Sequence, residues 1–307
     1  MSKITIVLAT YNGELYLKEQ LDSILNQSFK DYSLLIGDDG STDNTLNILK
    51  EYQKRYSHIT VLKNRERLGV VYNFEKLINQ VSTDYIALCD QDDIWDIDKL
   101  EKSIEYLENH NQEKPLMFHC DLRGISGDNK KLYNSFFEMR GYAFFVDRAV
   151  DVMLGRCGVM GNTIVFNQAL KKKILPFPKD LMVHDYWIAL VNEFVGRRVT
   201  YNKPLLFYRL HANNTSKSFR KSIKSKLDRK KIPLPFCDIK RELVLEEFLN
   251  RFEIDKKDKK IVDDFLEYLY FKKNYLSLVL LVFKYNFFRI GFKYKIKLLG
   301  AMLWKKR

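Results

Sequence analysis

The sequence predicts an α/β fold in which a mostly parallel, open sheet is flanked by helices. Three observations predict it. Short apolar runs alternate with segments of helical period, three of those runs end in polar loops, and 46% of the 307 residues are hydrophobic. A chain of this length and composition can bury a full core, in one large domain or two modest ones. A peptide hormone or a disulfide-bonded miniprotein is excluded.

The expected elements follow from the hydrophobic period, taken in chain order. Residues 4–8 form a short apolar run that is typical of a buried strand. Leu17, Leu21 and Ile24 then recur on one face of a helix. Residues 38–43 favour a turn followed by the start of a helix. On the same grounds we expect strands at 33–37, 59–62, 85–89, 116–120, 163–166, 199–201 and 205–209, helices at 46–52, 72–81, 100–107 and 182–194, and no assignable element within 123–157.

The sequence shows no sign of a disulfide framework, a signal peptide or a membrane-spanning helix. Its four cysteines lie far apart without a C-x-x-C pair, which indicates a reducing compartment and excludes a zinc knuckle. The apolar run at the N-terminus is too short for a signal peptide. The longest apolar run, 275–283, falls well short of the ~20 residues that span a bilayer. We therefore expect a cytoplasmic protein.

Positive charge is concentrated in the last part of the chain. The net charge is +13, yet residues 1–214 hold 27 basic and 28 acidic side chains, whereas residues 215–307 hold 25 and 11. This division predicts a nearly neutral domain at 1–214, followed by a basic, aromatic-rich helical region at 215–307. The excess of Lys and Arg fits an acidic partner surface, either phospholipid headgroups or nucleic acid.

Asp90-x-Asp92, at the end of the expected strand 85–89, is the most informative short motif. Two carboxylates at this spacing can share one hard divalent cation, and Mg²⁺ or Mn²⁺ held in this way keeps positions open for the phosphate oxygens of a substrate. A lone motif of this kind is more often a solvated turn with a helix cap. Asp38 and Asp39, at the end of another strand, favour the metal site, because like charges in one crevice require a cation or hydrogen-bond donors.

Weaker signals lie elsewhere. Asp185, at the start of the expected helix 182–194, fits a general base that the helix N-terminus keeps ionised, and an ordinary helix cap is the alternative. His211 fits either a ligand or a structural histidine. Asp93 and Asp96 fit caps of the helix that follows them.

Taken in order, six segments resemble the family 2 glycosyltransferases of the GT-A fold. They are 7–13 (VLATYNG), 25–29 (LNQSF), 38–43 (DDGSTD), 89–95 (CDQDDIW), 184–187 (HDYW) and 206–214 (LFYRLHANN). The fourth, fifth and sixth segments look most like bacterial rhamnosyltransferases that build cell-wall and capsular polysaccharides. The resemblance implies a Rossmann-like GT-A domain at 1–214 that transfers a sugar in an inverting, metal-dependent reaction.

The resemblance implies a donor site at the ends of the first strands. Thr10, Tyr11 and Asn12 would line the nucleotide pocket. Asp39 would hydrogen-bond the pyrimidine base, and Asp38 would support it. The donor would be a nucleotide sugar, with dTDP-β-L-rhamnose as the best candidate. The acceptor would be a polyprenyl-linked saccharide.

The resemblance also implies the metal and the catalytic residues. Asp92 would coordinate Mn²⁺ or Mg²⁺ on the donor diphosphate, while Asp90 would lie near the ribose or share the metal. His211 would complete the metal or diphosphate shell, and Asp185 would be the catalytic base. The acceptor sugar would lie near Gly161, Asn162, His184 and Trp187. Related enzymes often have paired glycines or Gly-Thr in place of Gly161-Asn162, so the acceptor contacts of this chain are left open.

The basic region fits helices that lie on an anionic membrane. Residues 216–235 hold eight Lys or Arg against one Asp, Phe265 and Tyr268 recur on a helical face with Ile261, and 285–304 interleaves aromatics with Lys and Arg. This predicts a peripheral location on the inner face of the cell membrane. The alternative is a helical subdomain whose aromatics pack on the catalytic domain while its lysines stay solvated. Nucleic acid is not expected, because no RNP or Gly-Arg pattern occurs.

Two further functions stay open on the sequence alone. The first is a transferase of the same fold that uses a UDP-hexose or UDP-N-acetylhexosamine. The second is a protein that binds a nucleotide sugar or nucleic acid without catalysis, which a metal-dependent donor-hydrolysis assay would distinguish from an enzyme.

Overall fold

The structure is a computed structural model that describes residues 2–142, 145–155, 158–179, 181–211, 241–269 and 275–287. Its strands are β1 (Ile4–Thr10), β2 (Tyr32–Asp38), β3 (Ile59–Lys63), β4 (Tyr85–Cys89), β5 (Ile94–Trp95), β6 (Leu116–Ser126), β7 (Lys131–Tyr133), β8 (Val165–Asn167) and β9 (Arg197–Leu210). Within the described ranges they form one mixed sheet in the order β3-β2-β1-β4-β8-β6-β9-β5, with β7 paired to β6. The expected α/β architecture is confirmed.

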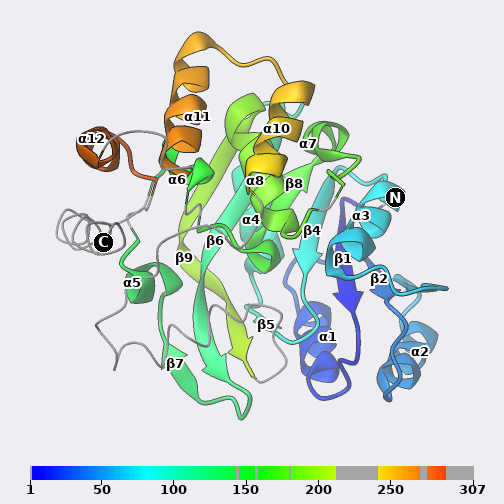
Figure 1. Ribbon diagram of the computed structural model, residues 1–307. Coiled ribbons are helices and arrows are strands. Elements are labelled where there is room, and N and C mark those ends of the chain that lie inside the picture. Colours follow the sequence, from blue (N-terminus) through cyan, green and yellow to red (C-terminus); the bar gives the residue numbers. More distant parts are fainter. Residues whose placement is uncertain are drawn as a thin grey trace.

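Helices cover both faces of this sheet, as Figure 1 shows. In the first 211 residues they are α1 (Leu17–Leu25), α2 (Thr45–Arg55), α3 (Val70–Gln80), α4 (Lys99–Glu108), α5 (Phe136–Arg140), α6 (Val150–Leu154), the 3₁₀ turn η1 (Gly161–Thr163), α7 (Gln168–Ile174) and α8 (His184–Val195). The hydrophobic core is divided by the sheet: α1, α2 and α4 pack on one face, and α3, α6, α7 and α8 pack on the other.

The first four strands form the parallel half of the sheet. β2 and β4 both pair in parallel with β1, and β3 pairs in parallel with β2. Side chains of β1 alternate between the two cores, with Val7 on one face and Ile6 and Leu8 on the other. The register places Thr10 opposite Asp38, so the carboxyl ends of these strands lie at one edge.

The second half of the sheet is mixed. β8 runs antiparallel to both β4 and β6, whereas β9 runs parallel to β6 and antiparallel to β5. Two strands were expected at 199–201 and 205–209, but β9 is one continuous strand. The reason is a shift of the register opposite Asp121, which lets β9 continue through Pro204 where the sequence resembles a turn.

The sequence assigned no element to the segment 123–157, and in the described part of that segment the elements are short. β6 continues to Ser126, and β7 returns along it in an antiparallel pair. Ser135 caps the start of α5, where its hydroxyl accepts the backbone N–H of Glu138, and Gly141 caps the end of α5 in the left-handed conformation, with a φ of 65°. Elements this short show no clear helical or strand period, which is why the hydrophobic pattern did not predict them.

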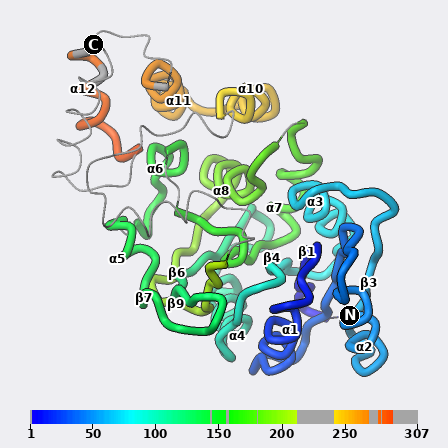
Figure 2. The backbone as a smooth tube through the Cα atoms, turned by 60° about the horizontal axis from the view of Figure 1, so that its bottom comes forward, coloured from blue at the N-terminus to red at the C-terminus, as the bar shows by residue number. Residues whose placement is uncertain are grey.

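Part of the basic C-terminal region packs into the same core as the sheet. Its described helices are α10 (Arg241–Arg251), α11 (Lys256–Leu269) and α12 (Tyr275–Lys284). Phe248 of α10 and Phe265 of α11 are fully buried in the core that also holds Trp187 of α8. Figures 1 and 2 both place α10 and α11 beside α6 and α8, away from β1–β3. The predicted face of Phe265 and Tyr268 is therefore a packing face.

Two other parts of the basic region carried predictions that the described residues do not cover. The Lys- and Arg-rich run at 216–235 and most of the aromatic segment 285–304 lie outside the described residues. None of the helices among the residues that are described is both long and apolar enough to cross a bilayer.

Candidate active site

Three loops meet where β1, β2 and β4 end. The backbone N–H of Asp39 donates to the carbonyl of Thr10 at 2.9 Å, which joins the loops after β1 and β2. The hydroxyl of Thr10 donates to Oε1 of Gln91 at 2.6 Å, which joins the loops after β1 and β4. The parallel strands thus bring the polar segments together at one edge, as their order predicted.

Gln91 is a functional candidate that the sequence reasoning missed. Its Oε1 also accepts the backbone N–H of Tyr11 at 2.9 Å, and its Nε2 donates to the carbonyl of Tyr11 at 3.2 Å. A Cβ on Gly13 would lie 2.4 Å from Oε1 of Gln91, so only glycine leaves room for this side chain. The available signal was its position between Asp90 and Asp92, in a loop at the carboxyl edge of the sheet.

Asp39 is buried and held by backbone donors. Its Oδ1 accepts Nδ2 of Asn64 at 2.9 Å and the N–H of Leu68 at 2.7 Å, while its Oδ2 accepts the N–H of Gly69 at 2.8 Å. A carboxylate has about four acceptor positions, so one further donor fits on Oδ2. Asp39 therefore combines a fixed orientation with room for one N–H of a ligand.

The side chain of Asp38 forms its hydrogen bonds within its own turn. It is fully buried, and it accepts the N–H groups of Gly40 and Ser41 at 3.2 and 3.0 Å and the hydroxyl of Ser41 at 2.5 Å. Gly40 has a φ of 83°, which glycine adopts without strain. The contacts of Asp38 therefore shape the loop that follows β2.

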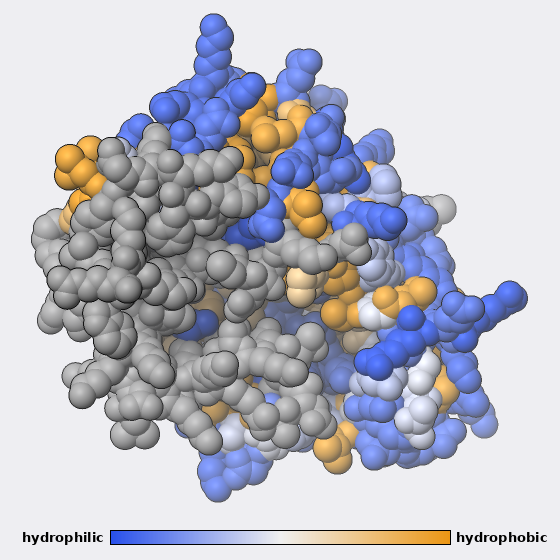
Figure 3. Space-filling model, in the orientation of Figure 1, coloured by the Kyte–Doolittle hydropathy of each residue, from blue (hydrophilic) through white to orange (hydrophobic). Residues whose placement is uncertain are grey.

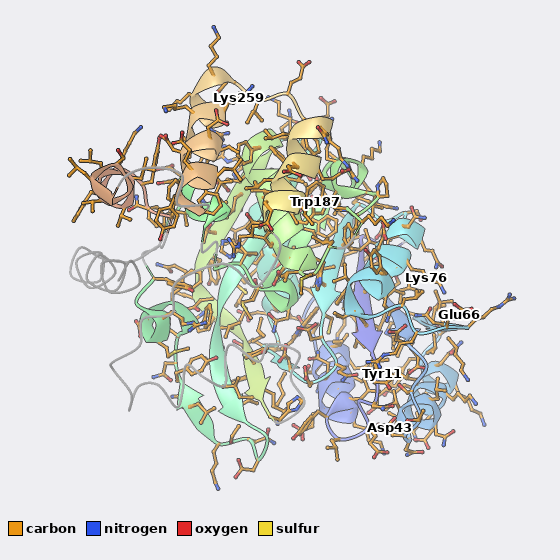
Figure 4. All side chains as sticks on the ribbon, in the orientation of Figure 1. Tyr11, Asp43, Glu66, Lys76, Trp187 and Lys259 are labelled. Atoms are coloured by element: carbon orange, nitrogen blue, oxygen red, sulfur yellow. The ribbon has the colours of Figure 1, made fainter. Side chains whose placement is uncertain are left out.

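Tyr11 and Asn12 form the outer wall of this crevice. The guanidinium of Arg67 lies over the ring of Tyr11, 3.9 Å from its centroid, which is a cation–π contact. Oδ1 of Asn12 accepts the N–H of Thr42 at 2.8 Å and so ties the loop after β1 to the one after β2. Figure 4 shows Tyr11 and Asp43 on the same side of the molecule.

Asp92 and His211 are brought together from segments 119 residues apart. Nε2 of His211 lies 2.7 Å from Oδ2 of Asp92, and both side chains are largely buried. Arg209, fully buried in β9, donates through Nε to the carbonyl of Asp92 at 2.8 Å and through NH2 to Glu19 at 2.7 Å. The end of β9 thus holds both the imidazole and the loop that carries the carboxylate.

Carboxylates gather around this pair. Burial, and after it the charges of Asp92 and Asp185, raises the pKa of Asp90. A cation placed among these groups would remove that penalty. Within the part of the chain that the structure describes, no three His, Cys, Asp or Glu side chains are arranged to hold a metal ion among themselves. Asp92 supplies an oxygen, which suits both Mn²⁺ and Mg²⁺, and His211 supplies a nitrogen, which suits the transition ion Mn²⁺ better than the oxygen-preferring Mg²⁺.

Asp185 lies in the first turn of α8 and is held by two backbone donors. The N–H of Tyr186 donates to Oδ1 at 2.6 Å, and the N–H of Gly161 donates to Oδ2 at 3.2 Å. Burial nevertheless raises the pKa of Asp185 to about 6. A half-buried carboxyl with this pKa is ionised at neutral pH and able to accept a proton.

The residues expected at the acceptor divide into two groups. Gly161, Asn162 and His184 lie around Asp185: a Cβ on Gly161 would lie 3.0 Å from Nε2 of His184, and the pKa of His184 is lowered to about 4 by burial. Trp187 does not belong to this group, and its expected acceptor contact is wrong. Its ring is fully buried and its indole N–H donates to the carbonyl of Ile174 at 2.9 Å, on the α10 side of α8 (Figure 4).

Asp93 and Asp96 do not cap α4, contrary to expectation. The helix begins at Lys99, after Asp98 at the N-cap position. Asp93 is fully buried, where it accepts the side-chain N–H of Asn162 and the backbone N–H of Arg209. Asp96 forms an ion pair with Arg123. The two-residue strand β5 separates Asp93 from the helix, and Asp96 lies after that strand but two residues before the N-cap position.

Known proteins resemble this chain in sequence. The family model described as Glycosyl transferase family 2 matches residues 5–150. A dTDP-rhamnosyl transferase of Shigella flexneri, RfbG, is 47% identical over 231 residues, which cover 67% of this chain and 72% of that protein.

Solved structures agree on the fold. TarS of S. aureus in complex with UDP-GlcNAc superposes with a TM-score of 0.60 at 18% identity, covering 86% of this chain and 72% of that one. The mannosyltransferase PcManGT of Pyrobaculum calidifontis, in complex with GDP-Man and Mn²⁺, also gives 0.60, at 16% identity, covering 90% and 72%. With the identity to the Shigella protein, these findings show that the chain belongs to glycosyltransferase family 2 and has the GT-A fold.

Proposed function

We propose that this glycosyltransferase moves L-rhamnose from dTDP-β-L-rhamnose to a hydroxyl of a polyprenyl-linked saccharide, with inversion at the anomeric carbon. The observation that carries the proposal is that Asp39, Asp92 with His211, and Asp185 lie around connected loops. The loop of Asp39 is joined to the loop of Asp92 through Thr10 and Gln91, and the charge of Asp185 acts on Asp90 in that same loop. Asp39 fits a nucleobase. Asp92 with His211 fits a diphosphate with its cation, and Asp185 fits an acceptor hydroxyl. The 47% identity to a dTDP-rhamnosyl transferase supports the choice of donor.

The donor nucleotide would lie across the loops after β1 and β2. Thymine and uracil each carry an imide N–H, which matches the acceptor position left on Asp39. Tyr11 would offer its other ring face to the nucleobase, and Arg67, which covers the first face, would add a positive charge to this wall. Thr10 and Asn12 would keep this wall in place through their contacts with Gln91 and Thr42.

Asp92 and His211 would hold a divalent cation together with the diphosphate of the donor. Atoms that lie 2.7 Å apart can both reach one ion, and Mn²⁺ or Mg²⁺ commonly completes its shell with phosphate oxygens. When bound, such a cation stabilises the negative charge that develops on the leaving diphosphate. The Pyrobaculum mannosyltransferase, whose structure is a complex with GDP-Man and Mn²⁺, supports a divalent metal in this fold.

Asp185 would act as the general base. Its carboxylate takes the proton of the acceptor hydroxyl while that oxygen forms a bond to C1 of the donor sugar. The bond from C1 to the diphosphate oxygen breaks, and the nucleoside diphosphate leaves with the electron pair. The N–H groups of Tyr186 and Gly161 fix both carboxylate oxygens during this step. A single displacement inverts the configuration, so a β-linked donor gives an α-linked product.

We further propose that α12 rests on an anionic membrane that carries the acceptor lipid. Leu276 and Leu280 lie one helical turn apart and are 69% and 61% exposed, whereas Leu281 and Val282 on the other face are buried in the core. An apolar patch is visible at the position of α12 in Figure 3. The surrounding region 215–307 holds 25 basic and 11 acidic side chains, which complements anionic headgroups.

A donor screen tests the substrate. The purified chain is incubated with Mn²⁺, a polyprenyl-linked saccharide and, in turn, dTDP-β-L-rhamnose, a UDP-hexose and UDP-N-acetylhexosamine, and the glycolipid product is measured by mass spectrometry. We expect turnover with the rhamnose donor to exceed that with the others by about a hundredfold, the discrimination that a few misplaced hydroxyl contacts produce. Faster turnover with a UDP-sugar would replace rhamnose by that sugar.

Asp185→Asn tests the base. The amide keeps the shape and the contact with the N–H of Tyr186 but cannot take a proton, so transfer should fall by about 10²- to 10⁴-fold. Binding of dTDP, measured by calorimetry, should change less than twofold, which is within about 0.4 kcal/mol. Asp31→Asn, an exposed position before β2, serves as the matched control.

The pH profile gives this test a second readout. Because the carboxylate must be ionised to accept a proton, kcat/KM of the unmodified enzyme should fall as pH decreases through about 6, the pKa of Asp185. The residual rate of Asp185→Asn should lack that acid limb. A limb near the ordinary pKa of aspartate, or near-normal turnover of the Asn variant, would remove Asp185 from this role.

Asp92→Ala tests the metal. EDTA should abolish transfer by the unmodified enzyme, and added Mn²⁺ should restore it. In the variant, the affinity for Mn²⁺ in the presence of dTDP, measured by electron paramagnetic resonance, should weaken by about tenfold or more, because a carboxylate ligand is lost. Asp98→Ala, at the start of α4, should bind Mn²⁺ normally. Full activity in EDTA would contradict the metal requirement.

Replacement of the exposed leucines tests the membrane surface. The unmodified chain should co-sediment with phosphatidylglycerol vesicles, less at high salt and not with neutral vesicles. Leu276→Glu with Leu280→Glu should reduce binding by about tenfold or more, because two apolar contacts become repulsive charges. Leu243→Glu on α10, 45% exposed, is the control. If the unmodified chain does not bind, or the double variant binds equally well, α12 does not face the lipid.

A further inference from the structure

A lysine is fully buried at the start of α4, behind the loop that carries Asp92. Lys99 has no exposed surface, which is rare for lysine because a buried ammonium loses its hydration. Burial accordingly lowers its pKa to about 8. Its Nζ lies 3.2 Å from the centroid of the Trp95 ring and donates to the carbonyl of Asn162 at 2.8 Å. Because burying an ammonium group is unfavourable, the position of Lys99 indicates a role other than filling space in the core.

The carbonyl that Lys99 holds belongs to the turn that holds Asp185. Asn162 follows Gly161 in η1, and the N–H of Gly161 donates to Oδ2 of Asp185. The side chain of Asn162 donates to Asp93, which belongs to the loop after β4. The turn is therefore fixed on one side by Lys99 and Asp93 and supports Asp185 on the other.

The packing of this turn leaves it little freedom. A Cβ on Gly161 would lie 3.0 Å from Nε2 of His184, so the turn contacts the start of α8 directly. The ring of His184 in turn stacks on Phe74, with centroids 4.4 Å apart. A shift of the turn would therefore move the N–H of Gly161 away from Asp185, because α8 cannot follow it.

We propose that Lys99 is a positioning residue for the reaction: through the carbonyl of Asn162 it fixes the turn whose Gly161 N–H orients Asp185. The inference rests on the proposed role of Asp185 as the base. It also links the loop after β4 to the base, since Asp93 and Lys99 hold the same turn.

Direct electrostatics is the competing explanation. Lys99 lies close enough to Asp90 and Asp93 for its charge to favour their ionised forms. In that case its loss would weaken the site for the donor and its cation and would leave Asp185 unaffected. The charged groups that act on Asp185 are Arg241, which favours ionisation, and Asp90, with His184 neutral beside it. The two explanations therefore predict different kinetic effects.

Lys99→Met tests the inference, because methionine fills a similar volume without a hydrogen bond. We expect kcat to fall by about tenfold or more, the result of a mispositioned catalytic group, while the affinity for dTDP with Mn²⁺ stays within twofold. The acid limb of kcat/KM should move to higher pH, since the ionised form of Asp185 loses a donor. Lys102→Met, on the same helix and paired with Glu105, should match the unmodified enzyme.

Gly161→Ala provides the second variant, because it leaves Lys99 in place and adds no buried charge. Its methyl group meets His184 and displaces the turn, so the same three effects should appear: lower kcat, unchanged donor affinity and a shifted acid limb. This keeps the test decisive if Lys99→Met does not yield folded protein, which circular dichroism would show.

The outcomes separate the inference from the proposed function. Wild-type kcat and an unmoved acid limb in Lys99→Met, or in Gly161→Ala where the first does not fold, would overturn the inference. Weakened donor and Mn²⁺ binding with an unmoved limb would also overturn it, in favour of direct electrostatics. An active Asp185→Asn variant would instead overturn the role of Asp185 itself, whatever Lys99 does.

Discussion

The site depends on the common edge at which the parallel strands β1, β2 and β4 end. That alignment places Asp38, Asp39 and Asp90 in adjacent loops, and like charges so close together are unfavourable unless donors or a cation oppose them. Different groups offset the negative charges in each loop. Asp38 and Asp39 each accept three hydrogen bonds, two of them from backbone N–H groups, whereas Asp90 and Asp92 have fewer donors and so favour a bound cation.

Much of the fold was predictable because its signals are local. The apolar runs of β1 to β4 and the helical periods between them each lie within a few residues, and the order of strands and helices implies a parallel sheet. The edge where the acids converge follows from that order alone. Only the resemblance indicated that His211 and Asp92 lie near each other, because it assigned both to the metal or diphosphate shell and no local pattern joins residues 119 positions apart.

The features that could not be predicted from the sequence are those that depend on which side chains are buried. Lys99 opens a helix and so resembles a surface residue, and Asp93 precedes a helix and so resembles a cap. Both are buried because β5 and η1 close over them, which no local period reveals. Trp187 was misassigned for the same reason. It follows Asp185 by two positions, and two positions along a helix turn a side chain to a different face.

The C-terminal region also contacts the helix that carries Asp185, the proposed general base. The division of charge at residue 214 did not suggest this contact. α8 carries Asp185 at its start and packs through Phe194 on Phe248 of α10, with centroids 4.6 Å apart. Arg241, the first residue of α10, donates to the carbonyl of Leu154 at 2.7 Å, and its charge favours the ionised form of Asp185. Because α12 shares this core, a surface that rests on a membrane would be joined to the base through packed helices. The basic region would then set both where the enzyme works and how its base is held.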